Sequence, residues 1–446
     1  MRAPFFILMF MCLLPLCMVR PFIGILLFSW FSFMNPHQQM WDVASDLPYA
    51  QMVIAATVVG CFVAKEPRRL PQNATNMLIV AFMVFISITT LFCVGPYDMV
   101  LPKYINVFKI YLVVLLTSAL LTDKYRIHAL IWIMVVSLGY YGLRGGAFVI
   151  AHGGSDRVYG PPNSMIADNN HIAAALLVAL PLMNYVRLQS PYRHVRTVLL
   201  GVMLITLFAV VGSYSRGALI GLAGVATVLW FKSRNKMLSG VVLVVALAGV
   251  ITFMPEHWFD RMASIENYSQ DSSANERIQM WREAWGMALA RPLTGAGFSG
   301  PYLGSVVQAL LGGGATRAVH SIYFEVIGEH GFIGFAIWMA ITIFGLINTS
   351  WIIRTARKRP DLQWAVDLGR MAQVSIVAYM TAGAFLSLSY WDYYFTMLVA
   401  VAATRDLVAQ AVGVQVTRPW QARAIAPAPA PDLVMTRDGI SAGGGG

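Results

Sequence analysis

Charged side chains are scarce in this sequence. Asp, Glu, Lys and Arg make up 12% of the 446 residues, hydrophobic residues make up 58%, and the mean hydropathy is +0.63. This balance excludes a soluble globular domain. A helix needs about 20 mostly apolar residues to cross a hydrocarbon core about 30 Å thick, and such runs recur from the N-terminus to about residue 412. We therefore expect an all-α polytopic membrane protein.

Cysteines and metal-binding motifs are also scarce. The four cysteines, Cys12, Cys17, Cys61 and Cys93, lie in or beside hydrophobic runs and fit neither a disulfide framework nor a metal site. There is no Asp-x-Asp pair for a metal-bound sugar nucleotide, no GxxxxGK[ST] phosphate loop and no His/Cys/carboxylate cluster with metal-ligand spacing. We expect no metal and no cofactor. Carboxylates within the apolar runs are few, which disfavours a proton-driven transporter.

The net charge of +11 has a simpler explanation than binding to nucleic acid. The basic residues form short clusters between apolar runs, as the positive-inside rule predicts for cytoplasmic loops. We assign five such clusters to the cytoplasm: Lys65/Arg68/Arg69, Lys124/Arg126, Arg187/Arg193/Arg196, Lys232/Arg234/Lys236 and Arg354/Arg357/Lys358/Arg359.

The apolar runs predict about twelve membrane-spanning helices. Residues 4–19 and 21–34 form either two short spans or one broken element. The expected organisation is a set of N-terminal transmembrane helices at 1–254, a large periplasmic loop at 255–320, C-terminal transmembrane helices at 321–412 and a disordered cytoplasmic tail at 413–446. The other expected spans are 49–64, 77–94, 104–121, 127–150, 167–188, 197–213, 217–231, 238–254, 321–351, 371–388 and 394–412.

The long loop contains a predicted amphipathic helix, NERIQMWREAWGMALA. Trp281 and Trp285 are four residues apart and Leu289 continues the same face, so this helix either lies on the membrane or caps the bundle. The glycine-rich segment that follows is expected to be mobile and rich in turns.

Basic residues on the predicted outer side are almost all arginines. Because positive-inside bias disfavours cations there, each needs a reason. The rigid guanidinium fork suits bidentate contacts to a diphosphate, although pairing with acidic residues of the same loop is the alternative. Arg216 interrupts two apolar runs and either binds an anion or extends to the headgroups, and Arg277 either binds an anion or stacks on Trp281. The set is Arg144, Arg157, Arg216, Arg261, Arg277, Arg282, Arg291 and Arg317, with Lys103 as the lysine.

The segment RAVHSIYFEVIGEHG joins the long loop to the next apolar run and places His320 at the junction. A histidine with a pKa near neutrality is suited to take a proton from an attacking hydroxyl, whereas at a helix entrance it often acts as a cap. Glu325 and Glu329 lie just inside the span. Glu325 either orients the imidazole or binds a neighbouring helix.

These motifs resemble the O-antigen ligase and polymerase superfamily, over about residues 20–410. HSIYFEVIGEHG is similar to that family's H-N-x-x-L-x-x-x-x-E-x-G pattern, with Ser321 in place of the usual asparagine and Tyr323-Phe324 in place of the leucine region. SYSRG resembles its arginine motif, and ERIQMWREAW followed by RPLTGAGFSG resembles its loop pattern. NPHQQMWDVASDLPY and RVYGPPNSMIADNNH look like the O-glycosylation ligases associated with exosortase systems.

The resemblance implies a GT-C-like fold and a metal-independent, inverting glycosyltransferase that uses a glycan on undecaprenyl diphosphate. It implies that His320 is the catalytic base and that Arg216, Arg277 and Arg157 bind the diphosphate. We count Glu325, Arg291 and Asp168 as supporting residues. The expected activity is that of an O-antigen ligase acting on lipid A-core, with membrane lipids as further partners. The expected location is the bacterial inner membrane, with the active site facing the periplasm and the C-terminus in the cytoplasm.

Three alternatives remain at this point. An O-antigen polymerase and a protein O-oligosaccharyltransferase share the donor chemistry and differ only in the acceptor. A flippase or other transporter of lipid-linked sugars would also need an arginine-lined cavity. It would be expected to carry basic groups deep within many spans, whereas here they cluster on one side.

Overall fold

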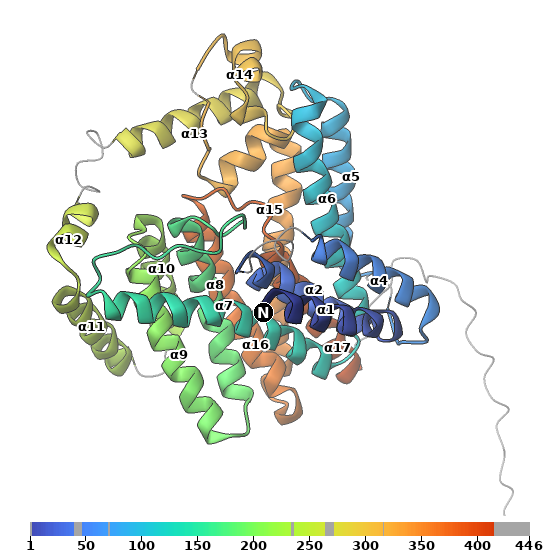
Figure 1. Cartoon of the computed structure of the whole chain (residues 1–446), viewed down its shortest axis with the longest axis vertical. Helices are drawn as coiled ribbons and strands as arrows, with labels where there is room; N and C mark the ends of the chain where they lie inside the picture. Colours follow the sequence, from blue (N-terminus) through green and yellow to red (C-terminus); the bar gives the residue numbers. More distant parts are fainter. Residues whose placement is uncertain are drawn as a thin grey trace, which may run out of the picture.

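The computed structural model describes residues 2–39, 47–69, 72–232, 236–263, 272–314 and 316–413, and every regular element in these ranges is a helix (Figure 1). This confirms the all-α prediction. The predicted tail at 414–446 and part of the polar loop before residue 47 lie outside the described residues. The helices are α1 (Arg2–Val19), α2 (Pro21–Met34), η1 (Pro36–Gln39), α4 (Tyr49–Val63), α5 (Ala74–Leu91), α6 (Tyr97–Leu120), α7 (Lys124–Ala151), α8 (Asn169–Gln189), α9 (Arg193–Val211), α10 (Arg216–Lys232), α11 (Lys236–Phe253), α12 (Glu256–Ala263), α13 (Ser272–Ala290), η2 (Gly300–Tyr302), α14 (Gly304–Leu311), α15 (Ile322–Ala356), η3 (Pro360–Leu362), α16 (Gln363–Gly383) and α17 (Asp392–Ala411).

Six of these helices, α5, α6, α7, α8, α9 and α15, are long and apolar enough to cross a membrane. Shorter apolar helices occupy Pro4–Val19, Pro21–Met34, Tyr49–Val63 and Arg216–Phe231. The count of about twelve spans therefore stays a prediction. The N-terminal run forms two helices, because the chain breaks at Arg20 and Pro21 starts α2, where its missing N–H costs nothing.

The predicted span at 371–388 is misplaced. The corresponding helix, α16, covers Gln363–Gly383 and therefore begins eight residues earlier and ends five residues earlier. Residues 384–391 instead form a non-helical connection to α17, in which the Ser389 Oγ lies 3.1 Å from the Ile322 carbonyl oxygen of α15. We call this segment the 384–391 loop.

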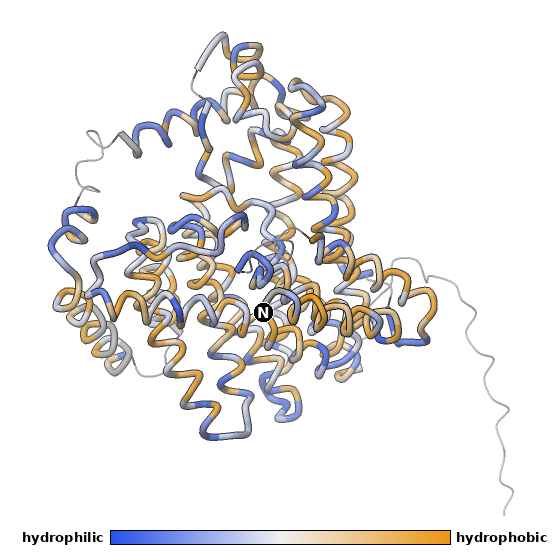
Figure 2. Tube along the Cα trace, viewed as in Figure 1, coloured by the Kyte–Doolittle hydropathy of each residue, from blue (hydrophilic) through white to orange (hydrophobic). Residues whose placement is uncertain are grey.

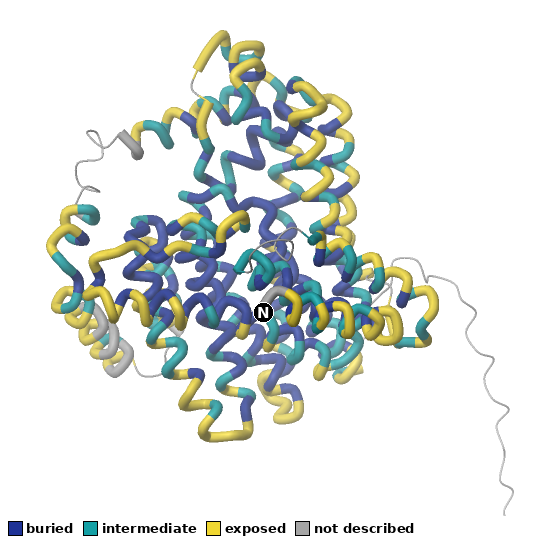
Figure 3. Tube along the Cα trace, viewed as in Figure 1, coloured by how far each residue is buried: buried dark blue, intermediate teal, exposed yellow. Residues whose placement is uncertain are grey.

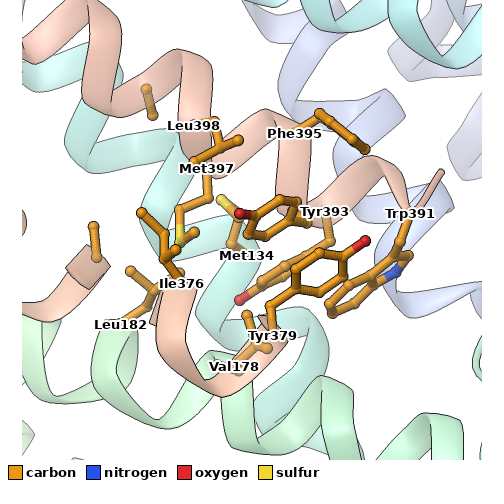
Figure 4. Close-up of a cluster of buried hydrophobic side chains, with 14 of the residues drawn as sticks. Met134, Val178, Leu182, Ile376, Tyr379, Trp391, Tyr393, Phe395, Met397 and Leu398 are labelled. Atoms are coloured by element: carbon orange, nitrogen blue, oxygen red, sulfur yellow. The ribbon is translucent and has the colours of Figure 1, made fainter. Parts of the chain in front are cut away.

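The core lies where α7, α8, α16 and α17 meet (Figure 4). Helices α8 and α17 are apolar over almost their whole circumference, as expected of helices surrounded by others. In the core, Leu182 of α8 lies near Ile376 of α16 and Val178 of α8 lies near Tyr379 of α16, and Tyr379 stacks on Tyr394 of α17 with ring centroids 3.7 Å apart. Figure 3 shows these helices as the most buried part of the molecule.

Helix α15 is bent sharply at Gly331, whose φ of 66° and ψ of −169° are not helical. The carbonyls that the bend releases find donors in the preceding loop: Ala296 N–H donates to Gly328 O and Gly297 N–H to Glu329 O, both at 2.9 Å. Gly295, also in the left-handed region at φ 63°, faces the bend. A Cβ on Gly331 would lie 2.6 Å from Pro292 O, so this close contact requires glycine.

A buried ion cluster joins α6 to α15. The Nζ atom of Lys103 lies 2.8 Å from Glu325 Oε1 and 2.7 Å from Glu329 Oε1, and both glutamates are almost fully buried. The remaining donors to these carboxylates are the Tyr302 hydroxyl (2.8 Å), the Ser389 hydroxyl (2.5 Å), the Ser299 N–H (2.8 Å) and the Tyr390 hydroxyl (2.7 Å). All four carboxylate oxygens are thus satisfied, and Glu325 binds a neighbouring helix.

We predict that Gly331→Ala destabilises the protein by about 3 kcal/mol, because alanine would combine left-handed backbone strain with a clash against Pro292 O. Thermal unfolding of the purified protein measures this. Gly312→Ala is the matched control, because Gly312 also has a positive φ (74°) but nothing lies within 4 Å of the position that its Cβ would take. It should cost only about 1 kcal/mol. Equal losses for the two variants would contradict the packing argument.

We predict that Lys103→Met destabilises the protein by about 3 kcal/mol, because two buried carboxylates would lose their cation. This is the lower end of the usual range, since 26% of the Lys103 side chain remains exposed. Adding Glu329→Gln should recover part of the loss. Lys109→Met is the control, because Lys109 is an exposed lysine on the same helix. If Lys103→Met unfolds at the temperature of the native chain, the cluster does not stabilise the fold.

Candidate functional site

His320 lies in the short segment between α14 and α15, beside the 384–391 loop. Its backbone is in the left-handed region (φ 50°), and its N–H donates to the Ser387 hydroxyl at 3.0 Å. Ser387 is in turn 3.5 Å from the Tyr302 hydroxyl, which binds Glu325 of the ion cluster. The histidine backbone is therefore connected to the buried charges by two side chains.

Helix α13 is attached to this segment by Trp281. The Trp281 Nε1–H donates to the Val319 carbonyl at 2.9 Å, next to His320 in the chain. Its ring stacks on Phe324 of α15, with centroids 5.3 Å apart and planes at 10°, and also contacts Phe385. Arg277 lies four residues before Trp281, about one helical turn away. Trp281 therefore fixes the part of α13 that carries Arg277.

Arg216 begins α10, and the next residue packs against the same loop. A Cβ on Gly217 would lie 3.1 Å from the Cβ of Phe385. At Gly221, one turn on, the close neighbours are Leu177 of α8 and Ala382 of α16. Phe385 is thus a neighbour both of Gly217, beside Arg216, and of Trp281, one turn from Arg277.

Arg157 is exposed and lies against the segment that leads to Arg216. Its guanidinium carbon is 5.9 Å from the centroid of the Tyr214 ring, and Val158 N–H donates to Gly212 O at 3.2 Å. Tyr214 is buried, and its hydroxyl donates to Gly154 O at 2.6 Å. The structure therefore holds Arg157 close to the SYSRG segment, which also contains Arg216.

Asp168 is the N-cap of α8, a position at which aspartate is a favoured residue. Its Oδ1 accepts the Asn170 N–H at 2.8 Å and lies 3.3 Å from His171 Nδ1. Burial alone would raise the pKa of the Asp168 carboxyl, but the bonds from His171 and Asn170 outweigh it and hold the pKa well below its ordinary value. Asp168 is therefore ionised at neutral pH.

The electrostatic surroundings of His320 favour the neutral imidazole. Burial lowers the His320 pKa below its ordinary value, and the nearby charges of Arg277 and His171 lower it further. Asp168 and Glu325 act in the opposite direction and do not reverse the shift. At neutral pH the ring is thus unprotonated and can accept a proton.

The structure does not place all the predicted site residues near His320. Arg291 lies at the other end of α13, about 21 Å of helix from Arg277, and its Nη2 donates to the Phe92 carbonyl at 2.7 Å. Arg291 therefore links α13 to the end of α5. Glu325 belongs to the ion cluster with Lys103. Arg317 pairs with Glu276, which is the pairing alternative considered for the outer arginines.

Sequence reasoning missed the 384–391 loop and Tyr302. Phe385 and Ser387 contact the segments that carry the candidate residues, and Ser389 and Tyr390 bind the buried glutamates. The signal was a run of serine and aromatic residues, SLSYWDYY, within the expected last hairpin. Buried hydroxyls need hydrogen-bond partners, which lipid chains do not provide, so this run is not typical of a lipid-facing helix.

Comparison with known families divides the chain at about residue 200. Residues 1–190, which hold Arg157 and Asp168, match a family of unknown function, DUF5935. Residues 201–339, which hold Arg216, Arg277, His320 and the bend at Gly331, match the family described as O-Antigen ligase. No curated protein matches the chain. The chain therefore carries, at residues 201–339, a domain that matches the O-antigen ligase family.

Proposed function

We propose that this protein is an O-antigen ligase that transfers a glycan from undecaprenyl diphosphate to lipid A-core. The observation that carries the proposal is the shared scaffold around the 384–391 loop. Through Ser387 it holds His320, and through Phe385 it contacts the residues beside Arg216 and the tryptophan one turn from Arg277. Two arginines suited to a diphosphate and one neutral imidazole thus belong to one assembly, within a domain of the ligase family.

In the proposed reaction, His320 takes the proton of an acceptor hydroxyl as its oxygen attacks the anomeric carbon of the donor sugar. The new glycosidic bond forms as the bond between that carbon and the diphosphate oxygen breaks. Undecaprenyl diphosphate leaves with the electron pair, and Arg216 and Arg277 stabilise its charge. Attack opposite the leaving group inverts the anomeric configuration. The arginines fill the role that a divalent cation has in other diphosphate chemistry, so the reaction is metal-independent.

The proposal places the site at the periplasmic face of the bacterial inner membrane and the C-terminus in the cytoplasm. The five basic clusters support this orientation. If successive apolar helices cross the membrane in alternating directions, each cluster falls at the end of a helix that faces away from the side of His320. Arg157 contributes a further cation at the diphosphate, and Asp168 tunes the charge near His320.

The acceptor is tested by mixing the purified protein and undecaprenyl-diphosphate glycan, in the presence of a chelator, with each candidate acceptor in turn. Release of undecaprenyl diphosphate with a new glycolipid on lipid A-core supports the ligase. Extension of the glycan itself indicates a polymerase, and modification of a protein indicates a protein O-oligosaccharyltransferase. Movement of the donor across the bilayer without bond breakage would contradict the enzyme.

We predict that His320→Gln lowers the rate of transfer by about 10²- to 10⁴-fold, because the base is lost while the fold remains. His152→Gln is the control, an exposed histidine at the C-cap of α7, and should transfer at the native rate. Thermal unfolding of each variant confirms that it is folded. Near-native transfer by His320→Gln would rule out this mechanism.

We predict opposite shifts of the acidic limb of the pH-rate profile in two further variants. Transfer by the native chain should fall as the pH drops through the lowered pKa of His320. Arg277→Gln removes a charge that lowers this pKa, so its limb should move to higher pH. Asp168→Asn removes a charge that raises it, so its limb should move to lower pH, and asparagine still caps α8. Shifts in the same direction would contradict the electrostatic account.

A further inference from the structure

Helix α13 has three faces rather than the two of an ordinary surface helix. One face is buried against α15 and consists of small or flexible apolar residues. A second face is polar. The third consists of Trp285 and Leu289, continued beyond the helix end by Leu293, and these side chains are 45%, 60% and 63% exposed. The buried face is Met280, Ala284, Met287 and Ala288, and the polar face is Asn275, Gln279, Arg282 and Glu283.

The third face, which we call the α13 stripe (Trp285, Leu289 and Leu293), lies beside the ends of two membrane-spanning helices. Trp285 packs edge-on against Phe332, which begins the second half of α15, with ring centroids 5.3 Å apart. The Phe332 N–H donates to the Pro292 carbonyl at 2.9 Å, next to Leu293. These contacts fix the height of the stripe relative to α15.

A further contact fixes the position of the α13 stripe relative to α5. Arg291, between Leu289 and Leu293, donates to the carbonyl of Phe92, just past the last residue of α5. Leu91 and Phe92 are themselves 69% and 59% exposed. The α13 stripe is therefore next to one end of α5, and Figure 1 shows α13 at a level similar to the upper ends of α5 and α6.

Below the stripe, both spans expose apolar side chains along one side. Figure 2 shows α5 and α6 as largely hydrophobic, and Figure 3 shows exposed residues alternating with buried ones along both helices. On α5 the exposed large residues include Met77, Val80, Val84 and Ile88, which recur at helical spacing. On α15 they include Ile333, Ile343 and Ile347. Only lipid chains solvate such a surface on a spanning helix, and the α13 stripe continues it at its upper edge.

We propose that α13 is an interfacial helix whose stripe, Trp285, Leu289 and Leu293, lies in the acyl-chain boundary of the membrane leaflet next to it. Tryptophan and leucine beside arginine are the residues expected at that depth, because the apolar side chains enter the leaflet while the guanidinium stays with polar groups. This resolves the two roles predicted for the helix, since one face caps the bundle and another contacts lipid.

A second protein copy is a weaker candidate for the occupant. The three side chains expose on the order of 300 Å² together, whereas a stable protein interface needs about 800 Å² on each partner. To reach that area, an interface with a second copy would also have to include the lipid-facing side of α5 and α15. The stripe is therefore better explained as the edge of the lipid-contacting surface than as the centre of an interface.

The consequence concerns the depth of the candidate site. Arg277 lies twelve residues before Leu289 on the same helix, about 18 Å along its axis. Anchoring α13 in the leaflet at Leu289 therefore also fixes the distance between Arg277 and the bilayer. The headgroup of a lipid-linked substrate lies in this region near the bilayer. The lipid contact itself does not depend on the reaction proposed for His320.

Site-specific photo-crosslinking tests the proposal. The full-length protein, carrying a benzophenone amino acid in place of Leu289, is reconstituted in dioleoylphosphatidylcholine vesicles, irradiated and measured by intact-mass spectrometry. The matched control replaces Gln279 on the polar face of α13, and replacement of Ile343 on α15 gives the lipid-facing reference. Leu293, beyond the helix end, provides a second position if the Leu289 variant does not fold.

We expect lipid adducts at Leu289 and Leu293 at a level similar to Ile343 and at least tenfold above Gln279. A yield at both stripe positions no higher than at Gln279 would overturn the proposal. A crosslinked dimer in place of a lipid adduct would overturn it in favour of a second copy. Because no transfer reaction is measured, the outcome is independent of whether the protein is a ligase.

Discussion

The two carboxylates of Glu325 and Glu329 are withdrawn from water on one face of α15, and the surrounding structure depends on satisfying them. An unpaired buried charge is very costly, so each oxygen needs a donor. The donors come from three places in the chain: Lys103 of α6, Ser299 and Tyr302 at the η2 segment, and the 384–391 loop. The loop positioned in this way also supplies the hydroxyl that binds the N–H of His320.

The bend at Gly331 follows Glu329 of the cluster by two residues. A straight helix would leave no room for the loop at residues 292–297, whose N–H groups bind the carbonyls of Gly328 and Glu329. Two glycines, Gly295 and Gly331, face each other there because neither position has space for a Cβ. The E-x-G and P-L-x-G-x-G motifs, which are far apart in the sequence, are thus two sides of one contact.

Much of the fold could be predicted because hydropathy reports the apolar helices directly, whereas capping rules alone allow either Asp168 or Asn169 to begin α8, and the structure has Asp168 there. Lys103 could be identified as an unusual cation on the outer side, but not as the partner of Glu325, because 222 residues separate them. The 384–391 loop was assigned partly to the expected span 371–388, because its apolar residues outweigh its serines in hydropathy. Ser387 and Ser389 nevertheless hold the loop in place. Arg291 was grouped with the anion-binding arginines because sequence position cannot show that it binds the Phe92 carbonyl at the far end of α13.

The buried polar centre is thus joined to the candidate site through the 384–391 loop. The central claim is that Arg216, Arg277 and His320 act on one lipid diphosphate. The most direct test is an experimental structure of the full-length protein with undecaprenyl diphosphate bound. We predict that the diphosphate contacts both Arg216 and Arg277, with its terminal phosphate next to a space bordered by His320. A diphosphate bound elsewhere, or held by neither arginine, would contradict this claim.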